Sequence, residues 1–136
     1  MNTISQPTRY KKVLIIDDDQ IDIYISERIL RSALFAEDIV SKSNSTDALN
    51  YLKSIRDTPE NLPCLIFLDL GMPAMDGFDF LVEFGKLEEQ IRSRSKIVIL
   101  STSLNYETHA ATIVQNNPMV KKFLNKPLTV EALEKI

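Results

Sequence analysis

The stretch CLIFLDLGMPAMDG, residues 64–77, says most about the fold of this chain. Its first seven residues are almost all apolar and are bounded by turn-forming residues, so they predict a β-strand buried on both faces. Asp69 lies at the end of that strand, and the loop after it, GMPAMDG, carries two glycines and a proline that shape its backbone. The stretch therefore places a carboxylate where a buried strand ends.

Further apolar runs alternate with amphipathic stretches along the whole chain. The predicted strands are KVLIID (12–17), DIVSKSN (38–44), CLIFLDL (64–70), KIVIL (96–100) and VKKFLN (120–125). The predicted helices cover 20–33, a segment opened by Ser45, 78–89, 105–115 and the segment after Pro127. This alternation predicts an α/β fold whose parallel sheet is covered by helices on both faces.

The helices carry their own signals. Ser45 and Thr129 have side chains suited to capping the helices that follow them. The helix at 20–33 is expected to bury one stripe of residues spaced by four, namely Ile21, Ile25, Ile29 and Ala33.

Length and composition fit one domain over 1–136, with an N-terminal extension at 1–10. Hydrophobic residues make up 44% and charged residues 26%, which is too polar for a membrane span. A net charge of −3 argues against direct contact with nucleic acid. The start, MNTISQPTRYKK, lacks the apolar stretch of a secretory signal, so a cytoplasmic location is expected.

Polar residues follow most of the predicted strands. Asp17 and Asp18 end the first strand, Asp69 the third, Ser101 the fourth and Lys126 the fifth. In such sheets ligands bind beyond the carboxyl ends of the strands, so these side chains are expected to converge. Three carboxylates and one lysine leave an excess of negative charge that a divalent cation would neutralise. Oxygen ligands without Cys or His favour a hard ion such as Mg²⁺.

With a cation in place, Asp69 is a potential nucleophile toward a phosphoryl group. Ser101 and Lys126 could then each hydrogen-bond one phosphoryl oxygen. Formation of an acyl phosphate would add roughly one negative charge and three strong acceptors, enough to draw a hydroxyl and its loop inward.

Taken in order, the motifs LIIDDD, IFLDLGMPAMDG, VILSTS and FLNKPLT resemble the receiver domain of bacterial two-component response regulators over nearly the whole chain. The resemblance implies a flavodoxin-like fold with strand order 2-1-3-4-5, an order for which a receiver protein is a standard example. It implies a phosphorylation-activated switch rather than an enzyme. The phosphoryl group would come from a sensor histidine kinase or a phosphotransfer protein, and a downstream protein partner would respond to the change.

The resemblance also assigns the acidic residues. Asp69 is the phosphoacceptor, and Mg²⁺ is bound by Asp17, Asp18, Asp69 and the backbone carbonyl of Gly71. Asp19 falls outside this set and is expected to cap or charge the start of the first helix.

Ser101 and Phe123 match the hydroxyl and aromatic positions that move on phosphorylation. Lys126 matches the lysine of the family pattern, and its bond to Pro127 is usually cis there. Thr102 is bulkier than the alanine of many members, and Gly71 has no side chain at a position that helps set the dephosphorylation rate.

After the last predicted helix no DNA-binding or enzymatic output domain is expected, so the chain is expected to be either a stand-alone receiver or a piece cut from a longer protein. The face made by the helix at 105–115, the strand at 120–125 and the last helix would be the signalling and homodimer surface. It would include Tyr106, Lys121, Lys122 and Phe123.

Two other functions are compatible with parts of the pattern. A phosphohydrolase with an aspartyl-phosphate intermediate usually has a second acid two residues after the nucleophile, where this chain has Gly71. A pseudo-receiver would keep the fold without phosphorylation. The complete set of Asp17, Asp18, Asp69, Ser101 and Lys126 argues against it.

Overall fold

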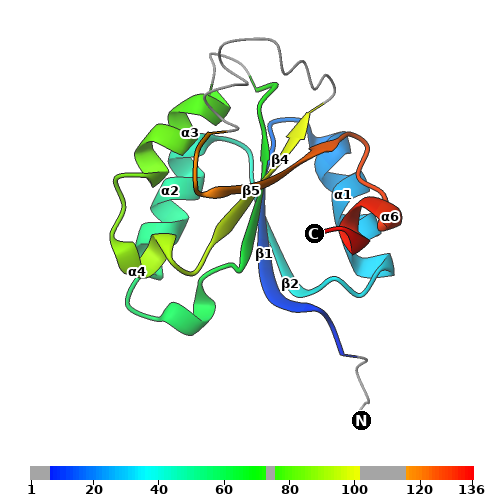
Figure 1. Ribbon diagram of the computed structural model, residues 1–136, viewed down its shortest axis with the longest axis horizontal. Coiled ribbons are helices and arrows are strands. Elements are labelled where there is room, and N and C mark those ends of the chain that lie inside the picture. The colour runs from blue at the N-terminus through cyan, green and yellow to red at the C-terminus, as the bar shows by residue number, and fades with distance from the viewer. Residues whose placement is uncertain (1–6, 73–75, 102–115) are drawn as a thin grey trace.

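A five-stranded parallel sheet with helices on both faces forms the body of the protein (Figure 1). The computed structural model describes residues 7–72, 76–101 and 116–136. The strands are β1 (Tyr10–Ile16), β2 (Ala36–Lys42), β3 (Leu65–Asp69), β4 (Lys96–Ser101) and β5 (Val120–Asn125). Their order is β2-β1-β3-β4-β5 with every pair parallel, which confirms the predicted sheet.

The described helices flank this sheet. They are α1 (Gln20–Ser32), α2 (Ser45–Ser54), α3 (Asp76–Phe84), α4 (Glu89–Arg92) and α6 (Val130–Glu134), with a short 3₁₀ turn at Pro59–Asn61. Figure 1 shows α2, α3 and α4 on one side of the sheet and α1 and α6 on the other. The predicted helix at 105–115 lies outside the described residues, as do Thr102 and Tyr106.

The two faces of the sheet carry separate apolar cores. Side chains alternate along each strand, so Leu14 and Ile16 pack toward α2 and α3 while Val13 and Ile15 pack toward α1. Phe80 and Phe84 stack at a centroid distance of 5.6 Å in the first core. Burial on both faces explains why the central strands are almost continuously apolar.

Several boundaries differ from those predicted. The strand β1 begins two residues earlier, at Tyr10, because its pairing with Ala36 of β2 extends the ladder. The strand β2 is shifted to 36–42 for the same reason. The helix expected over 78–89 ends at Phe84, where Gly85, a poor helix former, follows. Leu87 lies beyond the end of this helix and is still buried.

The predicted buried stripe of α1 is wrong for its first two residues, whereas Ile29 and Ala33 are partly buried and pack against the core on that side. Ile21 is 70% exposed and Ile25 is 37% exposed, whereas Ile23, Ser26 and Leu30 are buried. The buried face contains a serine and is spaced by three and four residues, so it is less conspicuous in the sequence than the stripe of isoleucines.

The helix caps follow the predictions in part. Asn44 caps α2 by accepting a hydrogen bond from the Asp47 N–H at 2.8 Å, so the expectation that Ser45 is the cap is wrong. Asn and Ser cap about equally well, and the chain turns into the helix one residue earlier. Thr129 caps α6 through the Ala132 N–H at 3.1 Å, as predicted. Asp19 caps α1, also as predicted.

Within the described ranges, no helix has both the length and the apolar character needed to cross a membrane.

Candidate functional site

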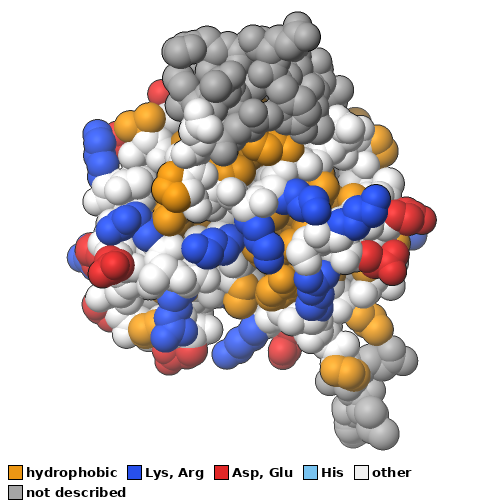
Figure 2. Space-filling model, viewed as in Figure 1, with side chains coloured by type: hydrophobic (Ala, Val, Ile, Leu, Met, Phe, Trp, Pro, Cys, Tyr) orange, Lys and Arg blue, Asp and Glu red, His pale blue; other side chains and the backbone are white. Residues whose placement is uncertain are grey.

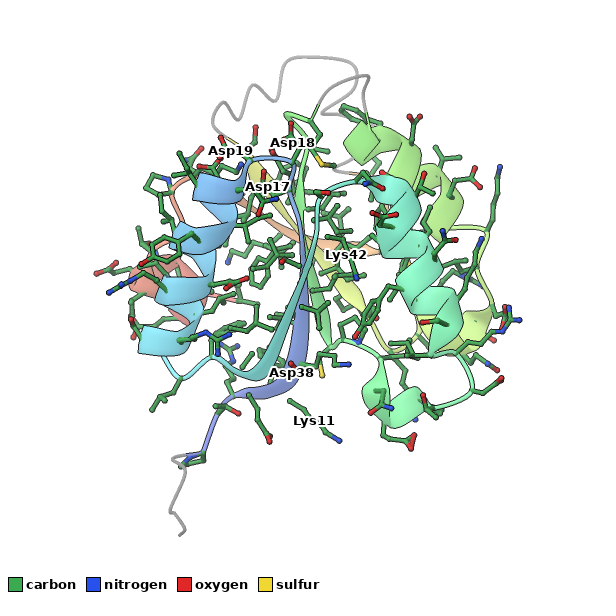
Figure 3. All side chains as sticks on the ribbon, turned by 180° about the vertical axis from the view of Figure 1, so that it is seen from behind. Lys11, Asp17, Asp18, Asp19, Asp38 and Lys42 are labelled. Carbon is green, nitrogen blue, oxygen red and sulfur yellow. The ribbon has the colours of Figure 1, made fainter. Side chains whose placement is uncertain are left out.

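The predicted polar residues meet at the end of the sheet where the strands have their carboxyl ends, called the carboxyl edge below. Parallel pairing of β1 with β3 aligns Ile16 with Leu68, so Asp17 and Asp69 follow on neighbouring strands. In the view from behind, Asp17, Asp18 and Asp19 lie together at this edge (Figure 3). Asp17 and Asp69 are buried, at 1% and 6% exposure, and Asp18 is exposed.

Asp17, Asp18 and Asp69 form a carboxylate cluster. One carboxylate oxygen from each residue lies within 4.8 Å of the others. Oxygen donors at this separation, one of them open to solvent, fit a hard cation such as Mg²⁺, which keeps several waters when it binds. The residues present therefore suit the ion that the sequence predicted.

Backbone amides hold the two buried carboxylates in place. The Asp19 N–H donates to Asp17 Oδ1 at 3.0 Å, and the Gly71 N–H donates to Asp69 Oδ1 at 2.8 Å. In both residues the other oxygen, Oδ2, faces Lys126. Each carboxylate is thus oriented by its own loop, with one oxygen directed into the site.

Lys126 supplies the ammonium that contacts these carboxylates. Its Nζ lies 2.7 Å from Asp17 Oδ2, 2.8 Å from Asp22 Oδ2 and 3.1 Å from Asp69 Oδ2, and its side chain is 9% exposed. The peptide bond from Lys126 to Pro127 is cis, as the resemblance implied. Asp22 belongs to the first turn of α1 and was not predicted to take part.

The buried charges perturb two pKa values. Burial, assisted by the nearby charge of Asp69, raises the pKa of Asp17 to about 6 although the hydrogen bonds from Lys126 and Asp19 lower it. Burial alone would lower the pKa of Lys126. The hydrogen bonds to Asp17 and Asp22 and the charges of Asp17 and Asp69 outweigh it, so the pKa of Lys126 is raised. The ammonium therefore stays charged, while Asp17 gains a proton unusually easily.

Ser101 and Phe123 occupy the positions that the sequence predicted. Ser101 is the last residue of β4 and is buried, and its carbonyl accepts the Lys126 N–H at 2.9 Å. Phe123 lies in β5 opposite Ile99 of β4 and is half-buried against the core on the α2 and α3 side. The hydrogen bond between Ser101 and Lys126 joins the carboxyl ends of β4 and β5 beside the lysine side chain.

Two glycines permit close approaches to Asp69. A Cβ at Gly77 would lie 2.7 Å from the Asp69 carbonyl oxygen and 3.1 Å from Leu70 Cα, so a side chain at that position would displace the backbone. A Cβ at Gly71 would lie 3.3 Å from Asp69 Oδ1. The sequence showed Gly77 only as a loop residue, and its contact with Asp69 could not be seen there.

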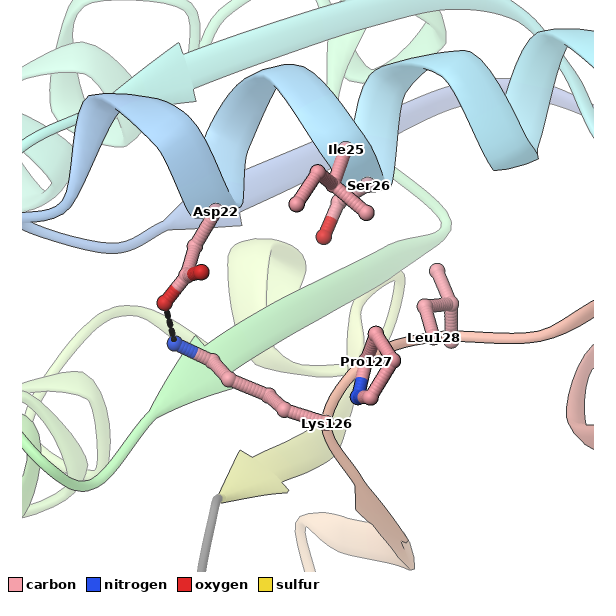
Figure 4. Close-up of a pocket in the computed structure, with 6 residues that line it drawn as sticks. All are labelled: Asp22, Ile25, Ser26, Lys126, Pro127 and Leu128. Atoms are coloured by element: carbon pink, nitrogen blue, oxygen red, sulfur yellow. Dashed lines mark hydrogen bonds and ion pairs between the residues drawn. The ribbon is translucent and has the colours of Figure 1, made fainter.

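A small cavity adjoins the site. It has a volume of about 170 Å³ and is lined by Asp22, Ile25, Ser26, Lys126, Pro127 and Leu128 (Figure 4). It lies between α1 and the residues that follow β5, so the lysine contacts both the cavity and the carboxylate cluster.

Comparison with known proteins identifies the family. The family model described as the response regulator receiver domain matches residues 13–136. This chain is a receiver domain. A solved two-component response regulator from Cytophaga hutchinsonii superposes on it with a TM-score of 0.82 and 26% identity, covering 94% of this chain and 93% of that one.

Relatives of this receiver domain include longer proteins. The two-component response regulator ARR2 of Arabidopsis thaliana is 30% identical over 127 residues, which are 92% of this chain and 17% of ARR2. Hybrid signal transduction histidine kinase C of Dictyostelium discoideum is 27% identical over 139 residues, 99% of this chain and 10% of the kinase. The receiver domain thus spans less than a fifth of the length of these two curated relatives.

Family membership sets the general role. Receiver domains act in phosphorylation-dependent two-component signalling with histidine kinases, and they are signalling domains rather than general catalysts. They bind Mg²⁺ at an acidic cluster, and Asp17, Asp18 and Asp69 form such a cluster in this receiver domain.

Proposed function

We propose that this receiver domain is a phosphorylation-activated switch in which Asp69 accepts a phosphoryl group from a partner sensor histidine kinase or phosphotransfer protein. The observation that carries the proposal is the grouping of three carboxylates within 4.8 Å of one another, with the Lys126 ammonium 3.1 Å from Asp69. Such a grouping repels itself unless a cation balances it, and it surrounds a carboxylate that can act as a nucleophile.

The proposed step is a phosphoryl transfer between two side chains. The carboxylate oxygen of Asp69 attacks phosphorus, a P–O bond forms, and the P–N bond to the donor histidine breaks. The electron pair of that bond stays on the imidazole, which takes up a proton. When Mg²⁺ is bound by Asp17, Asp18, Asp69 and the Gly71 carbonyl, it neutralises charge on the transferring oxygens.

Other residues of the carboxyl edge stabilise the product in this proposal. Lys126 donates to one phosphoryl oxygen and Ser101 to another. Inward movement of Ser101 lets Phe123 change rotamer, which alters the face that a downstream protein partner binds. The position of Ser101 next to Lys126, with its carbonyl bonded to the Lys126 N–H at 2.9 Å, supports this division of roles.

The output surface stays a prediction. On the face over β5, lysine and arginine side chains are spread across the centre (Figure 2). Lys121 and Lys135 are exposed, but Lys122 is half-buried and donates to the Lys135 carbonyl at 2.8 Å, so it also supports the end of α6. The proposed homodimer through this face, the domain extent of 1–136 and the cytoplasmic location are likewise predictions.

Neither alternative function gains support from a specific observation. Gly71 supplies no second acid for a phosphohydrolase, and a Cβ there would already lie 3.3 Å from Asp69 Oδ1. A pseudo-receiver has no need for the buried grouping of Asp17, Asp69 and Lys126.

Acetyl phosphate tests the proposal without knowledge of the kinase. Incubated with this donor and Mg²⁺, the protein is expected to gain one phosphoryl mass increment, located by peptide mapping to Asp69 and absent with EDTA. Asp69→Asn should abolish the increment. Asp38→Asn is the matched control, because Asp38 is an exposed carboxylate at the other end of the sheet, and it should be labelled like the wild type. Efficient labelling of Asp69→Asn would contradict the assignment.

A further inference from the structure

Asp22 approaches the site from α1, outside the carboxylate cluster. Its Oδ2 accepts a hydrogen bond from Lys126 Nζ at 2.8 Å (Figure 4). This distance nearly equals the 2.7 Å to Asp17 and is shorter than the 3.1 Å between Lys126 and Asp69. In the unphosphorylated protein, Lys126 is therefore held by Asp22 more closely than by the proposed phosphoacceptor.

Asp22 is not part of the proposed metal site. Within the described part of the chain, the cluster of carboxylates that could share an ion consists of Asp17, Asp18 and Asp69. The Asp22 side chain is also 33% exposed, whereas Asp17 and Asp69 are nearly inaccessible. Asp22 is therefore placed to influence the chemistry through Lys126.

The donors of Lys126 are limited. An ammonium has three N–H groups, and Asp17 and Asp22 accept two of them. A phosphoryl group on Asp69 would add three strong acceptor oxygens beside the same ammonium. Among the present partners Asp22 is released at the lowest cost, because water can solvate its partly exposed carboxylate after the lysine leaves.

The start of α1 fixes where Asp22 stands. Asp19 Oδ1 accepts the N–H groups of Ile21 and Asp22 at 2.9 and 3.2 Å, and the Asp19 N–H donates to Asp17 Oδ1 at 3.0 Å. The capped start of α1 therefore orients both Asp17 and Asp22, the two acids that hold the Lys126 ammonium. A change in the partners of Lys126 therefore acts directly on α1.

We propose that Asp22 is a positioning residue that holds the Lys126 ammonium in the unphosphorylated protein and yields it to the phosphoryl group on Asp69. This inference rests on the proposed function. A lysine bonded to Asp22 is less available to the transferring oxygens, and the Asp22 carboxylate repels an incoming anion. Asp22 therefore restrains phosphorylation and links it to α1.

The rate of labelling by acetyl phosphate with Mg²⁺ tests this restraint. Asp22→Asn keeps the side-chain shape but removes the charge, and it is expected to speed labelling roughly fivefold. Asp22→Glu restores a carboxylate and should return the rate toward that of the wild type. Asp19→Asn is the matched control, since it removes the same charge from the same turn, keeps a good capping residue and has no contact with Lys126. It should stay within about twofold of the wild type.

A double-mutant cycle on unfolding gives a second readout that does not depend on labelling. In metal-free buffer, Asp22→Asn is expected to shift the unfolding equilibrium constant roughly fivefold toward the unfolded state. In a Lys126→Met background the same substitution should shift it less than about twofold, because its partner is absent.

The outcomes separate this inference from the function on which it rests. Labelling of the wild type that is lost in Asp69→Asn supports the function. If that result is obtained, an unchanged or slower labelling rate in Asp22→Asn overturns the inference about Asp22 and leaves the proposed function standing. An equal gain in Asp19→Asn, or an unfolding effect that persists without Lys126, also overturns it. A wild type that takes no label contradicts the proposed function, and the inference fails with it.

Discussion

Two lysines of similar burial lie at opposite edges of the sheet, with different surroundings. At the carboxyl edge, the side chain of Lys126 is 9% exposed and its ammonium is within 3.1 Å of the carboxylates of Asp17, Asp22 and Asp69. Asp18 completes the carboxylate cluster with Asp17 and Asp69, so carboxylates outnumber the one ammonium that contacts them.

At the amino edge, Lys12 of β1 is 13% exposed and donates to neutral oxygens. Its Nζ lies 2.7 Å from the Tyr51 hydroxyl and 2.9 Å from the Asn61 carbonyl. The nearest carboxylate that it pairs with, Asp38, is 3.7 Å away and 57% exposed. Lys12 is thus satisfied by dipoles and by one solvated charge.

The contrast separates a lysine with a structural role from a lysine with a proposed functional role. A buried ion pair contributes little to stability, and buried charges of one sign in excess reduce it. An edge of the sheet that retains an excess of carboxylates therefore has a reason other than stability to keep them. The amino edge shows that this fold can bury a lysine without such an excess. The excess at the carboxyl edge is what a cation and a phosphoryl group would use.

Removal of the two lysines should have the largest and most unequal effects. Lys126→Met leaves buried carboxylates uncompensated and is expected to cost about 3–5 kcal/mol in the free energy of unfolding without metal. Mg²⁺ should restore much of this loss because it neutralises the same carboxylates. Lys12→Met should cost only about 1 kcal/mol, with no recovery by Mg²⁺. Urea unfolding in Mg²⁺ and in EDTA measures the stability of both variants. An equal loss of stability in the two variants, or an equal recovery with Mg²⁺, would contradict the difference drawn between the two lysines.

The pH dependence of magnesium stabilisation should follow Asp17. Burial raises the pKa of Asp17 from an ordinary 3.8 to about 6, so the folded metal-free protein holds a proton that the unfolded chain releases. The stability from this proton is fully present below the ordinary pKa and is lost as the pH rises through about 6.

Mg²⁺ competes with that proton. At about pH 7.5 and roughly one hundred times its dissociation constant, Mg²⁺ should add about 2.7 kcal/mol to the free energy of unfolding, and clearly less at about pH 5. Thermal melts at the two pH values check this, with Asp38→Asn as the control that leaves the difference intact. A gain in Tm that is the same at both pH values would contradict the role given to Asp17.

Alanine substitutions at two glycines compare how much space surrounds the backbone at the two edges of the sheet. Gly77→Ala is expected to cost about 1–3 kcal/mol, because its Cβ would meet the Asp69 carbonyl oxygen. Gly85→Ala is the matched control at the other end of α3, where the nearest atoms would be 3.4 and 3.5 Å away. It should lie within about 0.5 kcal/mol of the wild type. Chemical denaturation compares the two, and equal losses would show that Gly77 needs no special space.

The smallest expected effect concerns a strained residue at the amino edge. Leu34 follows α1 with φ of 52°, while the Phe35 N–H bonds to the Leu30 carbonyl at 2.9 Å and the Leu34 N–H to the Arg31 carbonyl at 3.1 Å. This helix ending normally uses glycine. Leu34→Gly should therefore raise the free energy of unfolding by about 1 kcal/mol, without altering phosphorylation. A loss of stability in thermal melts would contradict this account of the turn.

The sequence was sufficient for the sheet and for the placement of Asp17 and Asp69. Strands buried on both faces are continuous apolar runs, and an acid directly after such a run has to lie at the edge of the sheet. Both signals lie within short stretches of the sequence, so they can be recognised without knowledge of how the helices pack.

The packing of α1 was not predictable in the same way. Its apolar residues allow two stripes, and the stripe that is buried contains Ser26 rather than Ile25. Asp22 was missed for a related reason. An acid in the first turn of a helix is ordinarily explained by the helix dipole, and only the three-dimensional fold brings it to Lys126 from 104 positions away.

Site-resolved NMR titration with Mg²⁺ tests the account most directly. The prediction is saturable shifts of the backbone amides around Asp17, Asp18, Asp69 and Gly71, with the amides around Lys12 and Asp38 unchanged. Shifts that concentrate at the amino edge, or no saturable response at the carboxyl edge, would contradict the claim that the excess of carboxylates there forms a cation site.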